Sequence, residues 1–231
     1  MVQNILWITK GVFMQNLNNG IIDVTVAYVK EELAGAEGGH DWWHTLRVWN
    51  LAKRIGNLEV VDLLVVELGA LLHDIADSKF YDGDEEIGGI KARSFLSGLE
   101  LKKETIEHVV AIVRNVSWKG GKDKSVFWSS ELAVVQDADR LDALGAIGIG
   151  RTFSYGGYKG RELYNPGLEP NLSMTKAEYK NNTSPTINHF YEKLLLLKDG
   201  MNTGAGREIA KGRHEYMVDF LNKFKQEWDE N

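Results

Sequence analysis

Apolar residues recur at helical spacing along most of the chain, and no segment alternates apolar and polar positions over the length of a strand. Proline, which interrupts helices, occurs three times, always between residues 166 and 185. The pattern therefore predicts an all-α fold without a sheet. The expected helices cover residues 20–35, 41–57, 59–76, 85–98, 102–116, 129–150, 185–198 and 204–228.

No internal repeat and no low-complexity linker divides the chain, so residues 17–231 are expected to form a single helical domain. Residues 1–16 are interpreted as an N-terminal extension, because Met14 offers a later translation start. The one apolar patch in this extension is too short for a membrane span. Two loops rich in glycine and basic residues are expected, around residues 118–122 and 154–170.

Composition excludes several classes of function. The net charge is −6, and acidic and basic residues are mixed along the chain, so no basic stripe indicates binding to polymeric nucleic acid. The absence of cysteine excludes disulfides and cysteine-bound zinc or iron–sulfur sites, and it fits a reducing compartment. We therefore expect a cytoplasmic protein that acts on small molecules and has no membrane partner. The sequence leaves its oligomeric state open.

The helix expected over residues 59–76 is apolar nearly all round, which is typical of a buried helix. Its last turn nevertheless carries His73, Asp74 and Asp77. Carboxylates are unfavourable there, because the C-terminal end of a helix already bears partial negative charge and a buried carboxylate needs a partner. A divalent cation would compensate for both effects, and imidazole with carboxylate is a suitable ligand set. The alternative is that these groups cap the helix or pair locally.

A second group of polar residues, His40, Asp41 and His44, precedes another apolar helix. The two histidines are four residues apart and would share one face of a helix. Their spacing resembles half of a zinc-protease motif, but Asp41 stands where that motif has glutamate. The alternative for His40 is that it only neighbours the residue that begins the helix, either Gly39 or Asp41.

A third group consists of Asp137, Asp139 and Asp142. Asp139 has apolar residues one turn away on either side, so it is expected to face apolar surroundings. A calcium-binding EF-hand loop starting at Asp137 is excluded, because Asp142 occupies the position that requires glycine. Taken alone, the group is better explained by salt bridges on a helix face, with Arg140 as a partner.

Together the three groups resemble the HD superfamily of metal-dependent phosphohydrolases, whose pattern is a histidine, a distant His-Asp pair and a distant aspartate. The stretches HDWWHTLRV, ALLHDIADSKF and VQDADRLDALGAIGIGRTF are similar to those of one bacterial branch, and the resemblance begins near residue 20 and covers almost the whole remaining chain. It implies an all-α bundle with one divalent metal ion between helices. The implied metal ligands are His44, His73, Asp74 and Asp139.

The resemblance also selects among the candidate ligands. Asp139 is preferred to Asp137 because an Arg-Leu pair follows it, and His44 is preferred to His40 because an Arg-Val pair follows at the family's usual interval. Two-metal members add two further histidines before the last aspartate, whereas this chain has only His108 there, so one metal ion is expected. Manganese is the preferred metal, and iron, cobalt, nickel and magnesium are also compatible with the ligand set.

The resemblance implies hydrolysis of a phosphate ester or anhydride in a small phosphorylated metabolite. A nucleotide is the favoured substrate, with phosphate or pyrophosphate as the product. Asp77 is assigned the catalytic role of orienting water or acting as general acid or base, although many members of the family have glutamate there.

Phosphate binding requires cationic side chains near the metal. The candidates are Lys79, Lys119, Arg151, Lys159 and Arg161. The alternative function is a non-catalytic, metal-containing module that binds or senses a ligand.

Overall fold

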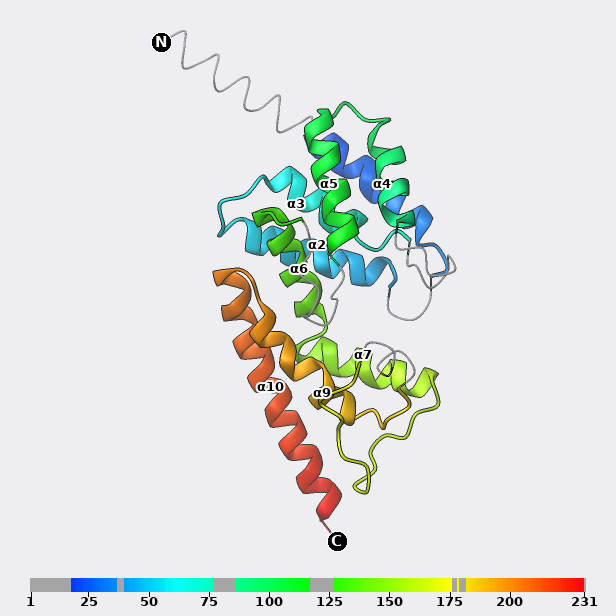
Figure 1. The fold of residues 1–231 in the computed structure, drawn as a ribbon, viewed down its shortest axis with the longest axis vertical. Helices are drawn as coiled ribbons and strands as arrows, with labels where there is room; N and C mark the ends of the chain where they lie inside the picture. The colour runs from blue at the N-terminus through cyan, green and yellow to red at the C-terminus, as the bar shows by residue number, and fades with distance from the viewer. Residues whose placement is uncertain are drawn as a thin grey trace.

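The computed structural model describes residues 18–36, 40–76, 86–116, 127–175, 178 and 182–230. Every regular element in these ranges is a helix (Figure 1), which confirms the predicted all-α fold. None of the described helices combines the length and apolar character needed to cross a bilayer. A first helix over residues 18–32 is followed by α2 (Trp42–Gly56), α3 (Leu63–Leu72), α4 (Ile87–Leu96), α5 (Lys103–Asn115), α6 (Ser130–Asp142), α7 (Gly145–Tyr158), α9 (Asn188–Glu192), the 3₁₀ helix η2 (Leu194–Gly200) and α10 (Gly204–Asp229).

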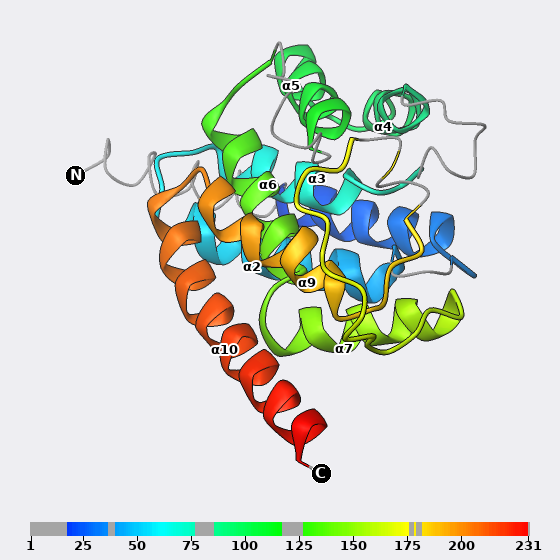
Figure 2. The same cartoon turned by 60° about the horizontal axis from the view of Figure 1, so that its bottom comes forward.

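Helix α3 lies at the centre of the first part of the fold, where α2, α5 and α6 pack around it (Figure 2). It begins after Asp62, whose carboxylate accepts hydrogen bonds from the amides of Leu64 and Val65. Nearly all of its later residues are buried, as its apolar composition predicts. Gly69 permits the close approach of α5, because a Cβ atom there would lie 3.0 Å from a side-chain carbon of Ile112.

Helix α2 packs against both α3 and α6. Asp41 is its N-cap, and the Asp41 carboxylate accepts a hydrogen bond of 2.8 Å from the amide of His44. Asp41 therefore begins this helix, which was one of the two starts expected from the sequence. The cap fixes the residue at which α2 begins, and therefore which side chains of α2 face α6.

The single helix predicted over residues 129–150 is in fact two helices. α6 ends at Asp142, and α7 starts at Gly145, whose φ of 75° lies in the left-handed region that favours glycine. α7 then continues to Tyr158, so the first part of the segment expected to be a loop is helical. The break changes the direction of the chain at the end of α6, and Arg151 in the middle of α7 donates a hydrogen bond to Asp142.

The C-terminal part of the fold is built on α10, which begins beside α6 and runs past α7 to the far end of the molecule (Figure 1). The segment predicted as one helix over residues 185–198 forms the short α9 followed by η2. Phe153 of α7, Phe190 of α9 and Phe220 of α10 pack together, with ring centroids 5.8, 5.9 and 6.0 Å apart. These aromatic contacts hold the three helices of this part to one another.

The buried carboxylate of Asp137 attaches the start of α10 to α6. It accepts hydrogen bonds from the backbone amides of Asn202 and Thr203, at 2.8 and 2.7 Å, and from the Thr203 hydroxyl at 2.8 Å. The same hydroxyl caps α10 by accepting from the amide of Gly206. A Cβ atom at Gly206 would lie 2.3 Å from a carboxylate oxygen of Asp137, so this junction needs glycine there.

We expect Asp137→Asn to lower the free energy of unfolding by about 2 kcal/mol, because an amide cannot accept from all these donors and leaves a buried group unsatisfied. Urea unfolding followed by circular dichroism measures the change. Asp199→Asn is the control, because the Asp199 side chain is 80% exposed and its 3.8 Å ion pair with Lys198 contributes little. Equal unfolding midpoints for the two variants would contradict the anchoring role of Asp137.

Candidate metal centre

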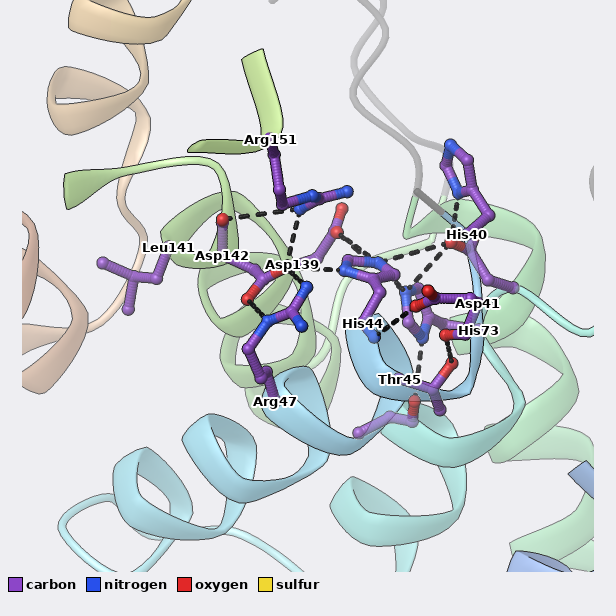
Figure 3. Close-up of polar contacts among 12 residues, drawn as sticks. His40, Asp41, His44, Thr45, Arg47, His73, Asp139, Leu141, Asp142 and Arg151 are labelled. Atoms are coloured by element: carbon purple, nitrogen blue, oxygen red, sulfur yellow. Dashed lines mark hydrogen bonds and ion pairs between the residues drawn. The ribbon is translucent and has the colours of Figure 1, made fainter. Parts of the chain in front are cut away.

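Three segments that are far apart in the sequence meet at one site (Figure 3). The first turn of α2 supplies His44, and the last turn of α6 supplies Asp139. α3 ends at Leu72, earlier than the sequence predicts, so His73 and Asp74 lie at its C-terminal end and in the turn that follows. His44 and His73 are buried, whereas Asp139 keeps 30% of its side chain exposed. The site is therefore closed on one side and accessible from the other.

The structure brings the two histidine Nε2 atoms close to each other and to one carboxylate oxygen of each aspartate. Nε2 of His44 is 3.2 Å from Nε2 of His73. Each of these two nitrogens lies 3.4 Å from Oδ2 of Asp74. Oδ1 of Asp139 is 3.5 Å from the first nitrogen and 3.9 Å from the second. Two ligands that bind a small cation at about 2.1 Å and at right angles lie about 3 Å apart, so this spacing suits such an ion.

Each imidazole directs Nε2 toward the cluster because its Nδ1 donates a hydrogen bond elsewhere. Nδ1 of His44 donates to Oδ2 of Asp142 at 2.8 Å, and Nδ1 of His73 donates to the carbonyl oxygen of Ala70 at 2.8 Å. In the neutral form, two Nε2 lone pairs then face each other and the nearby carboxylate oxygens. Such a set is repulsive unless a proton or a cation lies among its members. The residues present therefore fit a divalent metal ion.

The electrostatics of the cluster favour added positive charge. Burial alone lowers the pKa of His44, but its hydrogen bonds to Asp142 and Asp74 raise that pKa to about 9. Burial disfavours the ionised form of Asp74, yet the charge of His73 and the hydrogen bonds from neighbouring histidines hold its pKa well below the usual range. Asp74 thus stays ionised, and buried His44 holds a proton when no metal ion is near.

His40 does more than neighbour the residue that begins α2, which was the alternative considered for it from the sequence. Its Nδ1 lies 2.6 Å from Oδ2 of Asp74, and 34% of its side chain is exposed. His40, His44 and Asp74 form a second group of possible ligand atoms that overlaps the first. The four-residue spacing between His40 and His44 indicated that the two share a face of the helix. It could not indicate the contact with Asp74, which lies 34 residues further along the chain.

Asp142 is the largest omission of the sequence-based prediction, which considered it only to exclude an EF-hand. Its side chain is buried, and besides His44 it accepts hydrogen bonds from Arg47 Nε at 2.7 Å and Arg151 Nη1 at 2.6 Å. Burial would raise the pKa of Asp142, but the hydrogen bonds from His44 and Arg47 hold it far below its ordinary value. The signal in the sequence was its position three residues after Asp139, on the same face of one helix.

The cationic residues predicted to bind substrate occupy different places. Arg151 lies beside the cluster, held by Asp142. Lys159 and Arg161 contact the ring of Tyr155 near the C-terminal end of α7, at 5.7 and 5.6 Å from its centroid. These contacts do not involve the proposed ligands. Three predicted residues lie outside the described residues: Asp77, Lys79 and Lys119.

His108 belongs to a different contact from the metal cluster. Its Nε2 lies 2.9 Å from the hydroxyl of Ser129, the N-cap of α6, and its ring packs edge-on against Phe127. It therefore connects α5 to the start of α6. This position agrees with the interpretation of His108 as a residue outside the metal site.

The helical fold and the His/Asp cluster define an HD-domain protein, and the chain belongs to the HD family. The sequence profile of the HD domain matches residues 42–144, which contain all four proposed ligands. An HD-superfamily hydrolase from Bacillus thuringiensis, whose crystal structure has been solved, is 41% identical in sequence to this chain. That comparison covers 93% of this chain and 100% of the other, with a TM-score of 0.75.

A second relative is YpgQ of Bacillus subtilis, an uncharacterised protein. It is 37% identical to this chain over 87% of this chain and 90% of its own length. A crystal structure of YpgQ in complex with ADP covers 91% of this chain and 96% of the other, with 34% identity and a TM-score of 0.73. The similarity thus extends well beyond the HD domain itself, into the C-terminal helices.

We expect Mn²⁺ to raise the melting temperature of metal-stripped protein. A ligand that binds only the folded state stabilises it by about 2.7 kcal/mol at a hundred times its dissociation constant. Scanning fluorimetry during a Mn²⁺ titration measures the shift, and EDTA should reverse it. Asp139→Asn should remove most of the shift, whereas Asp137→Asn, on the same helix, should melt lower and keep it. A wild-type melting temperature that does not change with Mn²⁺ would contradict the metal site. Equal loss of the Mn²⁺-induced shift in both variants would contradict the assignment of Asp139 as a ligand.

Proposed function

We propose that the protein is a metal-dependent phosphohydrolase that acts on a small phosphorylated metabolite, with a nucleotide as the preferred substrate. The proposal rests on the convergence of two imidazole Nε2 atoms and two carboxylates beside two guanidinium groups. One divalent cation, manganese by preference, would be held by the four converging side chains. The proposed ligands are His44, His73, Asp74 and Asp139.

The charge balance of the site favours an anionic substrate. With both imidazoles neutral, as cation binding requires, the carboxylates of Asp74, Asp139 and Asp142 and the guanidinium groups of Arg47 and Arg151 together leave one net negative charge. A divalent cation would change this to one net positive charge. The two guanidinium side chains are 34% and 30% exposed, so a ligand can reach them. Phosphate groups suit such a combination of a metal ion with guanidinium donors.

A cation in the site would lower the pKa of a coordinated water and offset the negative charge that develops on the phosphoryl oxygens. The residues of the chain supply orientation. Asp142 and the carbonyl of Ala70 keep the protons of both histidines on Nδ1. His40 fixes the carboxylate of Asp74 from the exposed side. We propose that Asp77 orients the attacking water or transfers its proton, since it follows Asp74 by three residues.

A relative supports a nucleotide as the ligand. YpgQ of Bacillus subtilis was crystallised in complex with ADP, and that structure matches more than nine-tenths of this chain. ADP combines a diphosphate, which suits the charge of the site, with a base and a ribose. A nucleotide ligand would also suit the alternative function, a non-catalytic module that binds metal and ligand. Turnover therefore decides between the two functions.

We expect the Mn²⁺-loaded protein to hydrolyse at least one member of a panel of nucleoside phosphates and phosphoesters. Chromatography of the products shows whether phosphate or pyrophosphate is released. Asp74→Ala should lower turnover about 10³-fold, because losing the metal removes several kcal/mol of transition-state stabilisation. Tight nucleotide binding by the Mn²⁺-loaded wild type without turnover would favour the regulatory module instead.

Among the cationic candidates, we propose Arg151 as the principal phosphate-binding residue, with Lys79, Lys119, Lys159 and Arg161 as secondary ones. Arg151→Gln should raise KM about 10- to 100-fold, since a hydrogen bond to a charged group contributes about 1.5–3 kcal/mol. Steady-state kinetics at saturating Mn²⁺ measure this effect. Arg161→Gln is the matched variant and should raise KM by much less than Arg151→Gln, because Arg161 lies at the far end of α7 beside Tyr155. The opposite order would place the phosphate site at the end of α7.

A further inference from the structure

A buried carboxylate outside the proposed ligand set lies directly behind the cluster. Asp142 is 1% exposed, and its two oxygens accept hydrogen bonds from three side chains (Figure 3). Nδ1 of His44 donates at 2.8 Å, Nε and Nη2 of Arg47 donate at 2.7 and 2.9 Å, and Nη1 of Arg151 donates at 2.6 Å. The donors belong to α2 and α7, so one carboxylate of α6 connects both helices to the site.

The number of donors explains how this carboxylate is tolerated inside the protein. A buried ion is costly unless its lone pairs are satisfied and its charge is balanced. The two guanidinium groups balance the charge of Asp142, and the hydrogen bonds from Arg47 and Arg151 are charge-assisted. The remaining hydrogen bond comes from Nδ1 of His44, which is itself a proposed metal ligand, so this bond links Asp142 to the metal cluster.

We propose that Asp142 is a positioning residue for cation binding. It keeps the proton of His44 on Nδ1, so that the Nε2 lone pair faces the cation, and it holds Arg47 and Arg151 at the edge of the same site. One carboxylate thereby couples the metal-binding part of the site to its anion-binding part. The inference rests on the cation site proposed above, but it does not depend on turnover.

The tautomer of His44 is the physical reason for this role. A neutral imidazole with its proton on Nε2 has no lone pair there to bind a cation. A carboxylate can only accept, so its hydrogen bond with His44 selects the Nδ1–H form. An asparagine at position 142 would offer one acceptor and one donor to a set of four donating groups. In either orientation of the amide, a donor would face another donor.

The first test measures Mn²⁺ binding to metal-stripped protein by isothermal titration calorimetry, without substrate. Asp142→Asn should bind Mn²⁺ about 10- to 100-fold more weakly, which is the usual effect of losing such a partner of a metal ligand. The visible spectrum of the Co²⁺-loaded variant should also change, because it reports the ligand set. Asp137→Asn is the matched control, since Asp137 is equally buried on α6 but faces α10. It should retain the wild-type affinity and spectrum.

Arg47→Met separates positioning from general damage to the hydrogen-bond network. It removes two donors from Asp142 but leaves the contact between Asp142 and His44 in place. Mn²⁺ affinity should stay the same or increase, because a positive charge near the cation is lost. A decrease as large as that of Asp142→Asn would show that the network is merely structural and would overturn the inference.

A third measurement needs no variant and can still overturn the inference if Asp142→Asn fails to fold. Long-range ¹H–¹⁵N spectra of the wild-type protein loaded with Zn²⁺ should show the proton of His44 on Nδ1, and a proton on Nε2 would overturn the inference. All three measurements omit substrate. A protein that binds cations in this way but hydrolyses nothing would contradict the proposed function and still support the role of Asp142. An Asp142→Asn variant with wild-type Mn²⁺ affinity would overturn that role whatever the turnover.

Discussion

The contact between α2 and α6 is the constraint on which the site depends. His44 and Arg47 are three residues apart on one face of α2, and both donate to Asp142 at the end of α6. The contact between His44 and Asp142 joins residues 98 positions apart in the chain, so the site exists only in the folded domain. The apolar helix α3 packs against both partners and ends at Leu72, so that His73 is its C-cap. Any change that loosens α2 from α6 would therefore alter the cluster itself.

Helical periodicity was sufficient to predict the all-α fold and the buried position of α3. A helix that is apolar on every side has no stable location except the interior. The same reasoning drew attention to His73, Asp74 and Asp139, because ionisable groups are conspicuous in apolar surroundings. Their mutual distances could not be predicted, since these depend on how α2, α3 and α6 cross. The sequence thus indicates the kind of site, while the packing of helices sets its geometry.

The break between α6 and α7 was missed because the residues on both sides keep helical spacing. Gly145, with its left-handed backbone, was the local signal for a break between two helices. The consequence is chemical as well as structural, because the change of direction brings Arg151 to the carboxylate of Asp142. The contact between His40 and Asp74 was missed for a similar reason. Its partners are 34 residues apart, and no local pattern connects them.

Three aspartates of α6 show why packing, and not residue type, decides the role of each. Asp139 and Asp142 are three residues apart and face α2, whereas Asp137 is about 200° around the helix from Asp139 and faces the start of α10. Asp137 and Asp142 are buried and fully used as acceptors by neighbouring helices. Asp139 is partly exposed, and one of its oxygens faces two imidazole nitrogens. Because Asp137 and Asp142 accept from different donors within the described part of the chain, α6 serves the anchoring of α10 and the orientation of His44 through separate side chains.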